Sequence, residues 1–194
     1  AAEAKVNVKG VSIHPGSSKN RMKNAVLIAN EFIGMLPSWD TPAHSEKHEG
    51  FIHVDEIEGD VSNVSLHMIL RDFNRDKLEQ RKDLLERITA LLNSRYGEGT
   101  VSTQINDSYF NMKELILEKK YVFERAENAL RALGIEPIIS PVRGGTDGAR
   151  LTYMGLPCPN LCTGGGNFHG VNEYVSIDAM EKCVELIVEI ARAK

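Results

Sequence analysis

The chain has 194 residues, of which 42% are hydrophobic and 26% are charged, and its formal net charge is -4 at pH 7. This composition is typical of a soluble globular protein and excludes a disordered or collagen-like chain. The acidic balance, without a long cluster of Lys and Arg, argues against a nucleic-acid or membrane partner. No apolar run approaches the length of a membrane span, the opening residues resemble no targeting peptide, and the three cysteines fit a reducing compartment, so we expect a cytoplasmic protein.

The first elements alternate between strand and helix. Apolar residues alternate over residues 6–13 with a change of phase at Gly10, which predicts a strand with a bulge. Apolar side chains spaced three or four apart over residues 22–36 predict an amphipathic helix that ends before Pro37. A loop is expected from there to about residue 50.

The next segment predicts a hairpin, a helix and a last strand. Residues 51–73 form two expected strands that meet near residues 59–63, and the second has one apolar and one polar face. Asn74 is the expected N-cap of a long helix. Alternating residues over 101–105 predict a last strand after it. The order β-α-β-β-α-β predicts one antiparallel sheet with two helices on one face, the ferredoxin-like plan, over residues 1–110.

Residues 111–194 show a different pattern, in which helices alternate with short apolar strands. Helices are expected at about residues 122–133 and after Ser176, and strands at residues 136–142 and 157–163. This alternation is typical of an α/β layer with a parallel sheet. Two strands do not make a stable, doubly covered sheet, so this part is expected to be an incomplete portion of a larger domain.

A glycine-rich segment follows the first of these expected strands and reads Arg143-Gly144-Gly145-Thr146-Asp147-Gly148. Where a strand passes into a helix, free backbone N–H groups favour an anion, and a guanidinium can hold a carboxylate with two hydrogen bonds. A tight turn with a surface arginine explains these residues equally well. The segment is not a Walker loop, which needs Lys and then Ser or Thr after the last glycine.

Two histidines are candidates for chemistry. His169 follows the second expected strand, where open α/β sheets place their functional groups, although a lone histidine is usually not a metal ligand. Cys158 and Cys162 lie nearby, but core packing explains them better than zinc binding. His14 ends a strand before Pro15, where an exposed loop histidine is the simpler explanation.

The polar face of the sheet offers further candidates. Asn63 and Arg71 lie on the second strand of the hairpin and are candidate contacts for a substrate, although a solvated face is the default. The chain has no paired carboxylates at a convincing acid/base spacing and no nucleophile elbow.

Five segments occur in a characteristic order: IHPG with KNAV, VSLHMILRDFNRDKLEQRK, INDSYFNM, PVRGGTDGARLTYMGLPCPNL, and FHG with EYVSIDAMEKCVELIV. Together they resemble the dinuclear-zinc exopeptidases, and among these the tripeptide aminopeptidases. The family also includes carboxypeptidase G and succinyl-diaminopimelate desuccinylase. In it, a zinc-binding α/β domain is interrupted by a βαββαβ lid that also dimerises.

The resemblance implies a division of the chain and a role for several residues. Residues 1–110 would be the lid and dimerisation domain, and residues 111–194 the carboxy-terminal portion of the zinc-peptidase catalytic domain. It further implies that His169 is a metal ligand and that Arg143, with the two glycines after it, holds a substrate carboxylate. His14 would reach from the lid to the oxyanion of the transition state, commonly in the active site of the partner subunit.

The resemblance also implies two zinc ions per active site in the complete enzyme, which removes the amino-terminal residue of tripeptides by attack of metal-activated water. The other ligands and the catalytic glutamate of the family precede the lid and are absent from this sequence. Because zinc takes about four ligands, the chain alone is expected to be inactive and to hold no zinc. The expected partners are a short peptide and a second copy bound through the lid. The alternative is a stand-alone ferredoxin-like dimerisation or binding module without peptidase activity.

Overall fold

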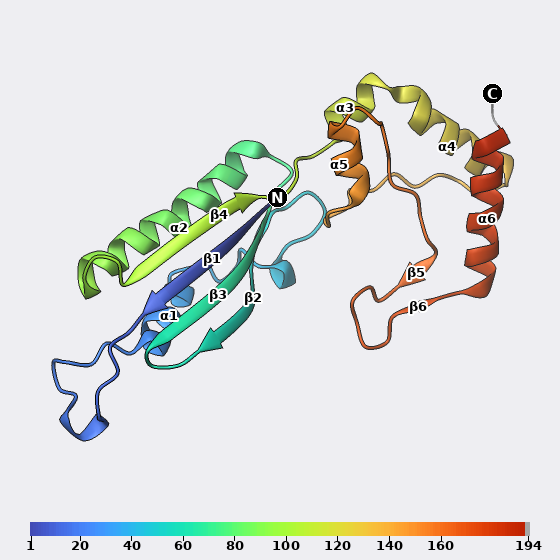
Figure 1. Cartoon of the computed structure of the whole chain (residues 1–194). Coiled ribbons are helices and arrows are strands. Elements are labelled where there is room, and N and C mark those ends of the chain that lie inside the picture. Colours follow the sequence, from blue (N-terminus) through green and yellow to red (C-terminus); the bar gives the residue numbers. More distant parts are fainter. Residues whose placement is uncertain (193–194) are drawn as a thin grey trace. The chain divides into compact units, whose positions relative to one another are not determined.

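The computed structural model describes residues 1–192. The chain divides into two compact units, Ala1–Phe110 and Asn111–Lys194 (Figure 1). Within the described residues, no helix has both the length and the apolar composition needed to cross a lipid bilayer.

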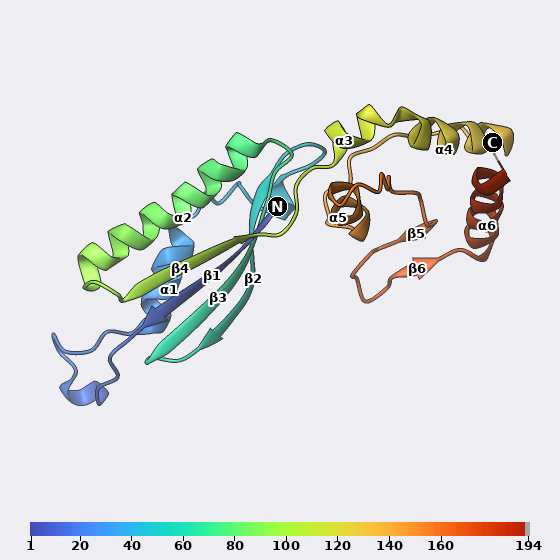
Figure 2. The same cartoon turned by 45° about the horizontal axis from the view of Figure 1, so that its top comes forward.

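The first unit is a four-stranded antiparallel sheet covered on one face by two helices (Figure 2). The strands lie in the order β2-β3-β1-β4, and each neighbouring pair is antiparallel. This confirms the predicted β-α-β-β-α-β order and the ferredoxin-like plan. In chain order the elements, including two short 3₁₀ turns, are β1 (Ala2–Lys9), η1 (Pro15–Ser17), α1 (Ala25–Gly34), η2 (Pro42–His44), β2 (Phe51–Gly59), β3 (Asn63–Arg71), α2 (Arg75–Tyr96) and β4 (Val101–Asp107).

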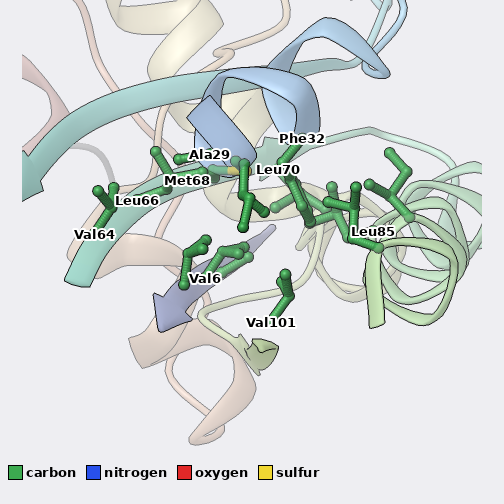
Figure 3. Close-up of a cluster of buried hydrophobic side chains, with 14 of the residues drawn as sticks. Val6, Ala29, Phe32, Val64, Leu66, Met68, Leu70, Leu85 and Val101 are labelled. Atoms are coloured by element: carbon green, nitrogen blue, oxygen red, sulfur yellow. The ribbon is translucent and has the colours of Figure 1, made fainter. Parts of the chain in front are cut away.

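The core of this unit lies between the sheet and the helices (Figure 3). Every second residue of β3 points toward the helices, as the two-residue repeat of a strand requires, and the predicted apolar face of β3 is confirmed. The largest side chains that the helices contribute are almost fully buried. The core includes Val64, Leu66, Met68 and Leu70 from β3, Ile28 and Phe32 from α1, and Leu78, Leu85 and Leu92 from α2.

The first strand differs from the prediction because β1 ends at Lys9 and has no bulge at Gly10. Val11 forms only an isolated bridge with Lys23 and is 44% exposed. A Cβ on Gly10 would lie 2.1 Å from the carbonyl oxygen of Val61 and 2.5 Å from that of Lys23. The change of phase therefore marks the end of the strand, at a point where two other backbone segments leave no room for a side chain.

Asparagine caps set the starts of both helices. The Asn24 side chain accepts hydrogen bonds from the backbone N–H groups of Val26 and Leu27, so α1 begins later than the predicted residue 22. The Asn74 side chain accepts from Lys77 N–H, which confirms the predicted cap of α2.

The second unit consists mainly of helices and a small hairpin. Its elements are α3 (Lys113–Glu118), α4 (Lys120–Ala132), α5 (Asp147–Tyr153), β5 (Gly165–Gly166), β6 (Tyr174–Val175) and α6 (Ile177–Arg192). The helices predicted near residues 122–133 and after Ser176 are confirmed, and the Ser176 side chain accepts from Ala179 N–H at 3.4 Å.

The two predicted strands of the second unit are wrong. Residues 136–142 and 157–163 are extended or irregular, and neither belongs to a strand. Ile138 and Ile139 are 89% and 67% exposed. A strand needs a neighbour to receive its backbone hydrogen bonds, and the described residues place no neighbouring strand beside either segment.

A buried ion-pair network fastens the loop after α1 to α2. Arg81 on α2 donates to both carboxylate oxygens of Asp40, at 2.9 and 2.7 Å, and to Asp72 at 2.6 Å. The side chains of Arg81, Asp40 and Asp72 are only 15%, 8% and 2% exposed. One guanidinium therefore pairs with two carboxylates that water reaches poorly.

Replacing Arg81 with alanine should lower the free energy of unfolding by about 3–5 kcal/mol, because two buried carboxylates would lose their counter-charge. Arg95 is the matched control on the same helix, since its side chain is 50% exposed and pairs with Glu31 at the surface. Arg95→Ala should cost at most about 1 kcal/mol. Urea denaturation followed by circular dichroism measures the free energy of unfolding of both variants. Equal losses would contradict the conclusion that the Arg81 ion pairs stabilise the fold more than the surface pair does.

Candidate functional site

His14 lies in a closed turn beyond the end of β1. It is the exposed N-cap residue of η1, and its Nδ1 accepts a hydrogen bond from the backbone N–H of Gly16 at 3.1 Å. Its carbonyl oxygen accepts from Ser17 N–H at 3.0 Å. The Ser18 hydroxyl donates to the Pro15 carbonyl at 2.9 Å. The imidazole therefore projects from a turn that is closed by its own hydrogen bonds.

Both ends of this loop are fixed to the turn between β2 and β3. Gly10 N–H donates to the Ser62 carbonyl at 2.7 Å, and Ala25 N–H donates to the Val61 carbonyl at 3.0 Å. Lys9, the last residue of β1, pairs with Asn63, the first residue of β3. The structure thus brings the His14 loop and Asn63 to the same end of the sheet.

Arg71 lies at the other end of β3. It donates a hydrogen bond to the Tyr109 hydroxyl, and its guanidinium lies 4.8 Å from the centre of that ring. Burial raises the pKa of Tyr109, and the Arg71 charge opposes that rise. Arg71 is therefore engaged by an aromatic neighbour inside the first unit.

The nine-residue length of β3 separates Asn63 from Arg71 by roughly 26 Å, at about 3.3 Å per residue. An extended tripeptide spans only about 11 Å. Within one chain, the two candidate substrate contacts cannot hold the same tripeptide.

Arg143 is half-buried and precedes the exposed residues Gly144 and Gly145. Thr146 occupies the N-cap position of α5 but makes no side-chain cap hydrogen bond. Because α5 has only seven residues, its dipole is too short to support the expected anion site by itself. A Cβ on Gly144 would meet nothing within 4 Å, so packing does not require glycine there.

Close packing at α5 instead requires Gly148, whose Cβ would lie 2.6 Å from the carbonyl oxygen of Cys158. The Thr152 hydroxyl donates to the Gly148 carbonyl at 2.7 Å and accepts from Cys158 N–H at 3.0 Å. These contacts hold the segment around Cys158 against the helix that follows Arg143.

His169 occupies the turn of the β5–β6 hairpin with a backbone φ of 64°. Residues other than glycine adopt this conformation in a few per cent of cases, with histidine and asparagine enriched, and Asn167 in the same turn adopts it as well. The His169 N–H donates to the Glu173 carboxylate at 2.9 Å. Glu173 is not among the residues predicted from the sequence, and its four-residue spacing from His169 within a short turn is the signal that could have identified it.

The donors among the described residues do not form a metal centre by themselves. No three His, Cys, Asp or Glu side chains of residues 1–192 are placed to hold a metal ion together. The three cysteines are free thiols. Cys183 Sγ donates to the Cys162 carbonyl at 3.5 Å, and desolvation raises the pKa of the Cys183 thiol. His169 alone cannot satisfy a zinc ion, which takes about four ligands.

Known proteins provide an independent comparison. The model of the family described as "Peptidase dimerisation domain" matches residues 1–100. The curated protein "Peptidase T" of Halothermothrix orenii is 51% identical over 190 residues, which are 98% of this chain and 47% of that protein. "Peptidase T" of Clostridium perfringens is 50% identical over 192 residues, which are 99% of this chain and 47% of that protein. The chain thus spans about half the length of the curated relatives it matches.

Solved structures share the fold. Aminopeptidase PepT from Bacillus cereus aligns with a TM-score of 0.73 and 22% identity, covering 97% of this chain and 50% of that one. A tripeptidase from Staphylococcus aureus aligns with a TM-score of 0.77 and 19% identity, with the same coverage of the two chains.

Substituting Glu173 with alanine should speed hydrogen exchange at the His169 amide, because that N–H would lose its acceptor. Glu173→Gln should slow the exchange again, since the amide carbonyl can still accept. Glu181→Ala, at an exposed position of α6, is the control and should leave the His169 amide unchanged. Exchange followed by NMR tests this, and an unaltered rate in Glu173→Ala would contradict the contact.

Proposed function

Because the chain belongs to the family of the peptidase dimerisation domain, we propose that it forms part of a cytoplasmic peptidase that removes the amino-terminal residue of tripeptides. The observation that supports this most strongly is the identity of about one half to proteins named Peptidase T over 98–99% of the chain. The first unit would serve as the lid and dimerisation domain. The second unit would be a portion of the catalytic domain.

The surface of the second unit supports the view that it is a portion of a larger domain. Its buried apolar residues are few and mostly small: Ile116, Ala126, Ala129, Ala149 and Leu186. Met180, Val184 and Ile187 share one face of α6 and are 51–61% exposed. A soluble domain rarely leaves such a face open, and the additional length of the relatives supplies a candidate to cover it.

We assign roles to three side chains within this proposal. His14 would donate a hydrogen bond to the substrate oxygen that becomes negative during hydrolysis, and its closed turn supports a fixed geometry. Arg143 would hold a substrate carboxylate with its guanidinium. His169 would be one zinc ligand, and the contact of its N–H with the Glu173 carboxylate fixes the backbone of the turn that carries it. The remaining ligands of two zinc ions would come from outside residues 1–192.

The same family membership suggests a homodimer through the first unit. β2 and β4 are the two edge strands, and an edge strand offers unpaired backbone groups to a second chain. Exposed apolar side chains gather on the β2 side, where Leu27 on α1 is 66% exposed and Ile57 on β2 is 53% exposed. We therefore propose that two copies meet through β2 and α1.

A stand-alone dimerisation module is the second candidate, and one observation favours it. The first unit closes its own core with four strands and two helices, and that core includes no residue of the second unit. The two candidates differ in whether the longer protein hydrolyses tripeptides.

Light scattering at tens of micromolar should give twice the 21.5 kDa mass of the chain. Leu27→Asp should give the monomer, because a buried charge in the interface would lack a partner. Leu91→Asp is the matched control on α2, where Leu91 is 43% exposed, and should remain dimeric. A monomer mass for the unchanged chain would refute the homodimer. A dimeric Leu27→Asp variant would show that the interface does not include Leu27.

In a longer active protein that carries this chain, His14→Ala should lower kcat by about a hundredfold or more and leave the melting temperature unchanged. Removal of one oxyanion donor affects the transition state but no packing contact. If His14 acts across the dimer, a mixture of His14→Ala and His169→Ala chains should recover part of the activity in heterodimers. Unchanged turnover in His14→Ala would refute its role, whereas inactive heterodimers would refute only the action across subunits.

A further inference from the structure

The contact between Gly16 and His14 determines which ring nitrogen carries the proton. The Gly16 backbone N–H donates to His14 Nδ1 at 3.1 Å. A nitrogen that accepts a hydrogen bond carries no proton, so the neutral ring is protonated on Nε2. Nε2 is the ring nitrogen farther from the backbone.

We infer that Gly16 is a positioning residue, whose N–H holds His14 as the Nε2–H tautomer and turns that donor away from the turn. The inference rests on the proposed role of His14 as a hydrogen-bond donor to substrate. A donor that is oriented before the substrate arrives needs no reorganisation during the reaction.

The lack of a side chain at position 16 also helps to position the His14 ring. A Cβ on Gly16 would lie 3.2 Å from Cε1 and 3.3 Å from Nδ1 of His14. These distances are shorter than ordinary van der Waals contact between such atoms, which lies near 3.5–4.0 Å. A methyl group there would require the imidazole to shift by a few tenths of an ångström, which changes the geometry of its hydrogen bond. Glycine therefore both donates to the ring and leaves it room.

The rest of the turn holds the donor in place. Pro15 restricts the backbone directly after His14, and Ser17 N–H donates to the His14 carbonyl at 3.0 Å. The Ser17 hydroxyl also faces that carbonyl, at 3.4 Å. Among residues 1–192, the contacts that orient the ring are therefore local and lie within residues 14–18.

The first experiment reads the tautomer directly on the 194-residue chain with ¹⁵N-labelled histidine rings. The His14 signals are assigned by their loss in His14→Asn. At pH about 8, Nδ1 should be unprotonated and Nε2 protonated. A scalar coupling across the hydrogen bond from Gly16 N–H to Nδ1 is also expected. A protonated Nδ1, or no such coupling, would overturn the inference whatever the enzyme does.

Gly16→Ala tests the positioning. It should weaken that coupling and lower kcat of the longer active protein by about tenfold with little change in KM, because a displaced donor no longer meets the oxygen. Glu86→Ala is the control, since Glu86 is exposed on α2 and lies outside the proposed interface. It should leave both measurements at their original values. Full coupling and full kcat in Gly16→Ala would overturn the inference.

Two conservative variants distinguish the loss of the donor at Nε2 from the loss of the acceptor for Gly16 N–H. Asparagine at position 14 can still accept from Gly16 N–H but has no donor near the place of Nε2, whereas glutamine carries an amide donor at about that reach. His14→Gln should therefore retain about tenfold more kcat than His14→Asn. The reverse order would overturn the inference while a loss in His14→Ala still supports the proposed function. Unchanged turnover in His14→Ala would instead refute the proposed catalytic role of His14, and the NMR result would then test only the tautomer.

Discussion

The close approach of three backbone segments at Gly10 determines the shape of the end of the sheet where His14 lies. Carbonyl oxygens of Val61 and Lys23 occupy the space that a Cβ would need. β1 must end there, and the chain leaves the sheet in a loop whose two ends are fixed to the β2–β3 turn. The His14 turn is therefore carried by a rigid support, and a side chain at position 10 would disturb the whole end of the sheet.

The two units differ in how completely they bury their apolar residues. In the first unit, one face of the sheet and two helices enclose a continuous core, and the loop after α1 is fastened by the Arg81 network. In the second unit, α6 exposes an apolar face, and the extended segment around Ile138 has no neighbouring strand within residues 1–192. The first unit thus has the properties of an independent domain, and the second has those of a portion of one. The length of the relatives is consistent with that difference.

The sequence predicts the first unit well because its signals are local. Alternation in β3 and the spacing of apolar residues in α2 follow from the geometry of each element, and asparagine caps mark the helix starts. The phase change at Gly10 predicts a bulge, because the alternation of apolar residues does not reveal that other carbonyl groups approach the glycine. Residues 136–142 and 157–163 have the composition of strands, but a strand also depends on a neighbour, which the segment itself does not encode.

The sequence predicts candidate residues for the site but not the contacts that they make. Motifs identified His14, Arg143 and His169, but they did not reveal the Gly16 contact or the Glu173 acceptor, which depend on the folded turns. Nor did they show that Arg71 lies at the far end of β3 from Asn63 and contacts Tyr109.

Tripeptide hydrolysis by the full-length protein of the reading frame that contains this sequence tests the central claim most directly. It should be compared with the same protein carrying His169→Ala. We expect release of the amino-terminal residue by the unchanged protein, and loss of both activity and bound metal in the variant at an unaltered melting temperature. A full-length protein that folds and dimerises but hydrolyses no tripeptide would contradict the account and favour the stand-alone module.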